Sequence, residues 1–222
     1  MKHTGTILLT AALLLAPSMC ATAQNNAAAA QNEDKVYNTR TWSQEDATRI
    51  VQEVRHKLLS LTNYSVFDSL SFGIQGKTIV LRGYASRPIL KSDAEKTVKG
   101  INGVAGVINQ IVVLPNSPND DRIRIGVYRR IYGQPALRRY SGSPMGFGDF
   151  PSIARMAGGI TQDPPRGYHA IHIIVNNGHV ILTGVVDRES DANIASMQAN
   201  STPGAFSVEN ELMFPGATQQ GK

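Results

Sequence analysis

Hydrophobic residues recur at helical spacing in the first patterned stretch of the chain. Ile50, Val54 and Leu58 fall on one face of a helix. Ser43 precedes them and can act as the N-cap, with Asp46 at the reciprocal position of a capping box. The pattern predicts an amphipathic helix that begins after Ser43 and buries one face.

The next segment alternates apolar and smaller residues, as β-strands do. Leu70, Phe72 and Ile74 lead to a turn at Gly76, and residues 78–82 are rich in β-branched side chains, so we expect a β-hairpin. A second helix with Pro88 in its first turn and a third strand over residues 104–113 complete this series.

The second half of the chain repeats this order of elements, which indicates an internal duplication. Leu81-Arg82-Gly83 matches Leu182-Thr183-Gly184, and Asn109 matches Asn210. The expected elements of the second copy are helices over 121–132 and 189–200, hairpin strands over 169–175 and 180–184, and a closing strand over 205–213. The fold class is therefore predicted as α+β, with two tandem αββαβ modules.

The N-terminus has the pattern of a secretory signal peptide. Lys2 precedes the apolar run 7–16 and the small-residue triplet 21–23, and about ten apolar residues are too few to span a bilayer. Cys20 follows Met19, a poor fit to a lipoprotein site, so we expect cleavage after Ala23 and a periplasmic or secreted protein. The expected divisions are a signal peptide 1–23, a disordered tether 24–42, module 1 at 43–114, a linker 115–120, module 2 at 121–215 with a long loop 141–166, and a tail 216–222.

These residues resemble the BON domain, a family of modules found in bacterial envelope proteins. The first copy carries Ile79-Val80-Leu81-Arg82-Gly83 and, from Gly103 to Ile111, Gly-Val-Ala-Gly-Val-Ile-Asn-Gln-Ile. The second copy departs from the family pattern at Ala205 and in its long loop. The resemblance implies phospholipid association or envelope maintenance without catalysis and without a cofactor. It also implies that the motif glycines serve the fold, namely Gly76, Gly83, Gly103, Gly178, Gly184 and Gly204.

No arrangement of residues in the sequence points to catalysis or to a metal site. His169 and His172 are three apart on an expected strand and point to opposite faces, so they cannot share a metal there. A two-ligand site with His179 across the turn is geometrically possible, but we expect surface histidines. The glycine-rich stretches lack the ending of a phosphate-binding loop, and Ser141 and Ser143 lack a nucleophile motif. We therefore expect a non-enzymatic binding protein.

Basic and aromatic residues are concentrated around the first helix of the second copy. Guanidinium groups suit phosphate, and tyrosines suit the headgroup boundary of a bilayer. With a net charge of +5 overall, this region is a candidate surface for anionic phospholipid. The alternatives are an ordinary solvated helix face, or a protein-interaction module that binds an envelope protein or another copy of itself; nucleic acid is not expected outside the cell. The candidate lipid-binding residues are Arg122, Arg124, Tyr128, Arg129, Arg130, Tyr132, Arg138 and Arg139.

Overall fold

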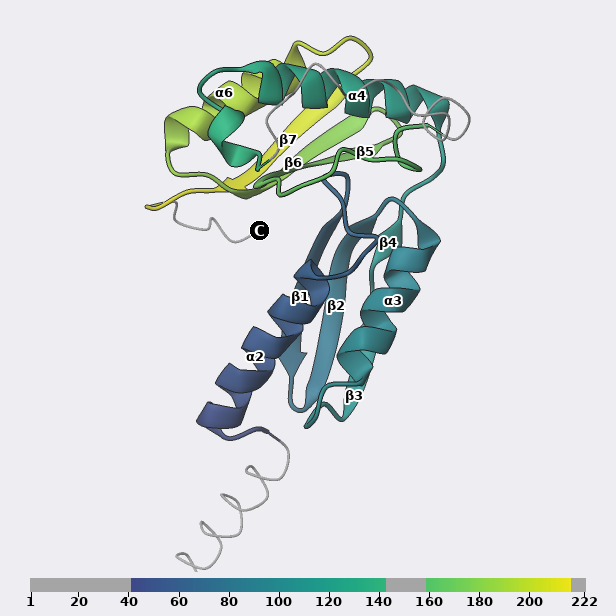
Figure 1. The fold of residues 1–222 in the computed structure, drawn as a ribbon, viewed down its shortest axis with the longest axis vertical. Coiled ribbons are helices and arrows are strands. Elements are labelled where there is room, and N and C mark those ends of the chain that lie inside the picture. Colours follow the sequence, from purple (N-terminus) through teal and green to yellow (C-terminus); the bar gives the residue numbers. More distant parts are fainter. Residues whose placement is uncertain (1–40, 143–158, 217–222) are drawn as a thin grey trace, which may run out of the picture. The chain divides into compact units, whose positions relative to one another are not determined.

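The computed structural model describes residues 41–142 and 159–216, and the chain divides into two units, 1–41 and 42–222. The expected signal peptide, nearly all of the tether, most of the long loop and the end of the tail lie outside the described residues. Within 42–222 two modules follow one another along the chain (Figure 1), and both combine helices with a mixed sheet. The predicted α+β class with tandem modules is confirmed.

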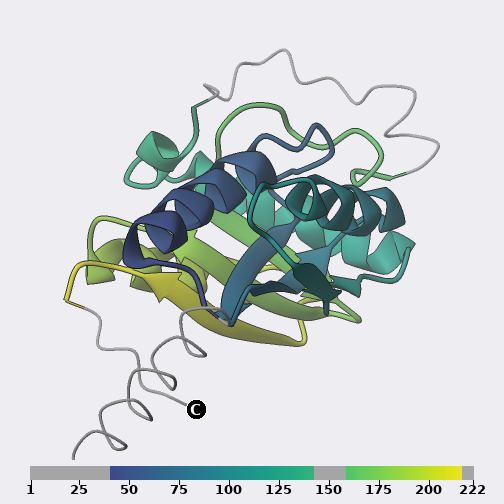
Figure 2. The ribbon, with the colours of Figure 1, turned by 90° about the horizontal axis from the view of Figure 1, so that it is seen from below.

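The first module places two helices on one side of a mixed sheet (Figure 2). Strand β2 is central because it pairs antiparallel with β1 and parallel with both β3 and β4. Ile50, Val54 and Leu58 lie in the core as their spacing predicts. The elements are α2 (Gln44–Leu59), β1 (Ser69–Gln75), β2 (Thr78–Ala85), α3 (Pro88–Lys99), β3 (Gly106–Asn109) and β4 (Val112–Val113).

The second module repeats this topology with β6 in the centre of its sheet. Strand β5 pairs antiparallel with β6, and β7 pairs parallel with it. The core combines large side chains of α4 and the sheet with the small Ala192, Ala195 and Ala199 of α6. The elements are α4 (Pro118–Gly133), η1 (Arg138–Tyr140), β5 (Ile171–Asn176), β6 (His179–Val185), α6 (Glu189–Asn200) and β7 (Ser207–Met213).

Two elements differ from the sequence expectation. Helix α4 begins at Pro118, inside the expected linker 115–120, because the Ser117 hydroxyl caps it by accepting from Asp120 N–H at 3.2 Å. The third strand of the first module is interrupted between β3 and β4, where the Asn109 side chain accepts from Ile111 N–H at 3.2 Å. Asn210 makes the same contact with Leu212 N–H at 3.2 Å inside the continuous strand β7, so this contact alone does not explain the interruption.

The loop between α2 and β1 supplies side chains to the core of the second module. Val66 and Phe67 are buried there, and Ile173 N–H in β5 donates to Val66 O at 2.8 Å. Thr183 in β6 also donates to the Ser69 hydroxyl at 3.0 Å. The sequence repeat gave no signal of this contribution, because it lies between the predicted elements.

Candidate functional site

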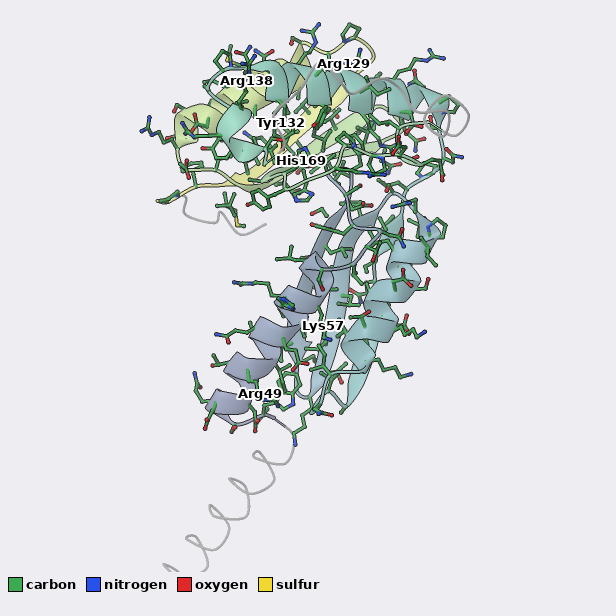
Figure 3. All side chains as sticks on the ribbon, in the orientation of Figure 1. Arg49, Lys57, Arg129, Tyr132, Arg138 and His169 are labelled. Atoms are coloured by element: carbon green, nitrogen blue, oxygen red, sulfur yellow. The ribbon has the colours of Figure 1, made fainter. Side chains whose placement is uncertain are left out.

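The eight candidate residues do not form one surface, because the structure divides them between the outside of α4 and its buried side. Tyr132 is fully buried, Arg124 is 1% exposed and Tyr128 is 9% exposed. Arg122, Arg129, Arg130, Arg138 and Arg139 are exposed. In Figure 3 Arg129 lies on the solvent side of α4, whereas Tyr132 and His169 lie towards the sheet. The candidate surface therefore reduces to arginines, without the tyrosines.

Arg124 is held inside the second module by two short hydrogen bonds. Its guanidinium donates to Asp121 Oδ1 at 2.7 Å and to Val175 O in β5 at 2.7 Å. A buried charge needs such partners, because desolvation would otherwise keep it out of the core. Arg124 thus ties α4 to the edge strand β5 and is not available to a ligand.

The two tyrosines of α4 enclose a histidine. Tyr132 O–H donates to Ile171 O at 2.6 Å, and the Tyr128 hydroxyl lies 3.0 Å from His169 Nε2. His169 Nδ1 lies 3.1 Å from Gly167 O, so a neutral ring can donate there and accept from Tyr128. The expectation that His169 is a surface residue is wrong, since it is 4% exposed and precedes β5. Its ring fills the space between α4 and the sheet.

Burial lowers the pKa of both His169 and His172 below the usual 6.5. The groups that face His169 are Tyr128, Tyr132 and His172. The His172 ring packs at a tilt against Tyr64 and lies near Asp68. A histidine with a lowered folded pKa stabilises the fold above its unfolded pKa, and this stabilisation is lost as the pH falls below that value. Acid should therefore weaken this module.

We expect the free energy of unfolding to fall as the pH is lowered from 7 to 5, with part of this loss due to His169. Denaturation by urea, followed by circular dichroism at each pH, measures it. In His169→Gln the loss should be smaller, because Gln does not titrate. His56→Gln, on the exposed surface of α2, should show the wild-type slope; equal slopes in all three proteins would contradict the assignment.

Arg139 belongs to a network that the sequence did not reveal. It forms ion pairs with Asp187 at 3.1 Å and with Asp191 at the start of α6, and Tyr140 O–H donates to Asp191 at 2.9 Å. Hydrogen bonding to Tyr140 and these carboxylates raise the pKa of Arg139. Its charge is thus largely balanced within the module, which makes it a weak candidate for phosphate.

Of the remaining four arginines, Arg122, Arg129 and Arg130 have no exposed carboxylate beside them on α4, and Arg138 lies in η1. The two acidic residues of this helix, Asp120 and Asp121, are both buried. Asp120 accepts from Asn177 N–H and Gly178 N–H at 2.9 Å, which holds the hairpin turn. By contrast, exposed Asp46 on α2 pairs with Arg49 at 3.4 Å. We call Arg122, Arg129, Arg130 and Arg138 the outer arginine row.

The outer arginine row extends over neighbouring elements. Arg130 donates to the Ser201 hydroxyl at 3.1 Å, at the end of α6, and Arg138 in η1 donates to Gly133 O at 3.5 Å. Within the described residues no ion pair involves any of the four. Because none of these ion pairs involves them, their charges are available to phosphate, which a guanidinium group can bind through two parallel hydrogen bonds.

Neither a metal site nor a membrane span is found in the described ranges, 41–142 and 159–216. No cluster of three metal-ligating side chains occurs there. None of the helices there has both the length and the apolar composition needed to cross a bilayer.

Comparison with known proteins gives one decisive match. The model of the BON domain matches residues 46–115 and 157–215, which together are more than half of the chain. The first match spans nearly all of the first module, and the second spans β5, β6, α6 and β7 without α4 and η1. The chain belongs to the BON domain family. The resemblance noted in the sequence is confirmed, and it covers both copies. No curated protein matches the chain.

Two solved structures of a bacterial secretion protein also align with this BON protein. One is the C-terminal domain of CdsD, a structural protein of the type III secretion system of Chlamydia trachomatis, at 14% identity and a TM-score of 0.24, covering 74% of this chain and 96% of that one. A second CdsD structure aligns at 13% identity and a TM-score of 0.23, covering 75% of this chain and 92% of that one. At these TM-scores the likeness adds nothing to the assignment of function.

Proposed function

We propose that this tandem BON protein is a non-enzymatic binding protein of the bacterial envelope that associates with anionic phospholipid through the outer arginine row. The observation that carries the proposal is the burial of both carboxylates of α4, which leaves only basic charges on its exposed face. Each basic residue near an anionic membrane contributes roughly 1 kcal/mol. Four together are enough for reversible peripheral binding.

The expected result is salt-sensitive binding to phosphatidylglycerol vesicles and little binding to phosphatidylcholine vesicles. Screening shortens from about 10 Å at 0.1 M salt to about 3 Å at 1 M, so binding should be lost at high salt. Arg129→Gln alone should weaken binding about fivefold, the equivalent of roughly 1 kcal/mol. Co-sedimentation over a range of lipid concentrations measures both effects; binding to the neutral vesicles with equal strength would contradict the proposal.

A second candidate function is self-association through the edges of the sheets. It is favoured by β1, which runs along one edge of the first sheet without a charged residue or a proline. Natural edge strands usually carry such protection against pairing with another chain. This function does not require lipid.

A further inference from the structure

Two of the four sheet edges are closed within the molecule. In the second module, β5 is covered because Ile173 N–H donates to Val66 O at 2.8 Å. In the first module, the edge formed by β3 and β4 is broken into strands of four and two residues. Covering an edge and interrupting it are both known ways to prevent strand addition. The open edges are therefore β1 and β7.

Strand β1 is suited to pair with another strand. It has seven residues, and its register with β2 is continuous from Ser69 to Gln75, so no bulge distorts it. Gln110 N–H donates to Leu81 O, which shows that Leu81 faces β3 and that its neighbour Arg82 faces β1. By alternation along the antiparallel pair, the backbone groups of Leu70, Phe72 and Ile74 point outward.

The outward positions of β1 are only partly used. The backbone of Leu70 hydrogen bonds to the Tyr64 hydroxyl. In the described residues, no backbone hydrogen bond reaches Phe72 or Ile74 from outside the sheet. The Ile74 side chain is also 45% exposed, which is unusual for an isoleucine on the helix side of a sheet.

Strand β7 also has seven continuous residues, but it is charged, and its Leu212 N–H already donates to Asn210 Oδ1 at 3.2 Å. Val186 N–H donates to Met213 O at 2.8 Å, so Met213 and its alternates face β6, whereas the backbone groups of Val208 and Asn210 point outward. Glu209 and Glu211 are exposed on the face of the sheet opposite the helices. Two copies of β7 would bring like charges together, which opposes their pairing with each other.

We propose that β1 of one copy pairs antiparallel with β7 of a second copy, in a register centred on Phe72 and the partner's Asn210. This register places Leu70 opposite the partner's Leu212, and Ile74 opposite the partner's Val208. Two apolar pairs then meet on the helix side, one on each side of the central pair of Phe72 and Asn210, and Ile74 becomes covered. Phe72 and Ile74 form the hydrogen-bonded pairs, at the positions where both edges are open.

Charge complementarity supports this register over the pairing of identical strands. Ser71 would lie opposite the partner's Glu211, and Arg82 lies directly across from Ser71 on β2. Ser71 is small, so the long Arg82 side chain can extend over it to the carboxylate. Arg82 is exposed and bound only to Gln110 Oε1, at 3.2 Å, in the described structure.

The pairing is heterologous, because the two surfaces that meet are different. In a pair of copies, one β1 and one β7 remain unpaired. Further copies can therefore add head to tail, and the pair does not close as a dimer. The inference deepens the second candidate function, and it holds or fails independently of lipid binding.

Sedimentation velocity of the wild type and four variants tests the proposal. Ser71→Glu sets a carboxylate against the partner's Glu211, and Glu211→Lys sets an ammonium against the partner's Arg82. Each variant alone should associate about fivefold more weakly than the wild type. An equimolar mixture of the two should associate again, because Glu at 71 then faces Lys at 211, and so should the double variant. Gln52→Glu, a charge-matched change on the exposed surface of α2, should behave as the wild type.

The outcomes separate this pairing from its alternatives. A wild-type protein that stays monomeric at every concentration overturns the proposal. If Ser71→Glu weakens association and Glu211→Lys has no effect, β1 pairs with β1, and this result also overturns the proposal. Weak association of both variants with no recovery in the mixture does so as well. Circular dichroism of each variant establishes that a loss of association is not a loss of fold.

Discussion

Replacing Gly184 by alanine should lower the free energy of unfolding by roughly 3 kcal/mol, as the sum of two effects. Gly184 has φ of 121°, and holding an L-residue in such a conformation costs about 1–3 kcal/mol. A Cβ there would also overlap Ala170 O, which directly precedes β5, and the required shift costs about 1–3 kcal/mol. Gly83 in the first module has φ of 109° and meets Ser69 O in the same way, so Gly83→Ala should act similarly.

Chemical denaturation followed by far-ultraviolet circular dichroism measures the effect. Gly133→Ala is a suitable control, because a Cβ at the end of α4 has nothing within 4 Å and alanine favours helix. We expect this control to be neutral or slightly stabilising. If Gly184→Ala cost no more than the control, the close approach of the strands could not be the reason for this glycine.

Replacing Arg124 by methionine should cost about 3–5 kcal/mol of stability. The change leaves Asp121 as a buried carboxylate without its ion-pair partner, and it leaves Val175 O without a donor. Asp121 cannot relax freely, because Gly159 packs directly against its carboxylate.

The double variant Asp121→Asn with Arg124→Met should lose less stability than Arg124→Met alone, since the unpaired charge is gone. The same denaturation experiment measures this coupling. A double variant less stable than the single variant would show that the ion pair is not the main reason for the loss. Any folded fraction of Arg124→Met should still bind vesicles, because Arg124 is 1% exposed.

The fold could be predicted from the sequence because the spacing of apolar residues and the residues that begin and end elements agree in both copies. The apolar spacing of Ile50, Val54 and Leu58 gave α2, and Pro88 gave the start of α3. The repeat then predicted the second module. Helix α4 begins at Pro118, three residues before the expected start at Asp121, because its N-cap Ser117 had been assigned to the linker.

The division of the arginines could have been predicted in part. Arg124, Tyr128 and Tyr132 are four residues apart, and each directly follows a residue of the apolar stripe Ile123, Val127 and Ile131. Two such rows side by side make a wide buried face. The basic and aromatic composition of this segment suggested that all of these residues are exposed, whereas the geometry of the helix buries Arg124 and both tyrosines.

Other features depend on contacts between distant segments and have no local signal. Phe67 lies between the predicted elements of the first module, yet it is buried in the core of the second. Likewise, Asp187 and Asp191 balance Arg139 from a segment about 50 residues away. Only the tertiary structure shows that this arginine is occupied.

The central claim is that the outer arginine row, and not overall positive charge, binds anionic membranes. A matched comparison tests it most directly. One variant changes Arg122, Arg129, Arg130 and Arg138 to Gln. The other changes four exposed basic residues of the first module to Gln, namely Arg55, Lys57, Lys96 and Lys99, so both variants lose four positive charges. Co-sedimentation with phosphatidylglycerol vesicles at low salt should show that the first variant no longer binds and that the second binds nearly as the wild type. Equal loss in both variants would contradict the account, since binding would then follow net charge alone.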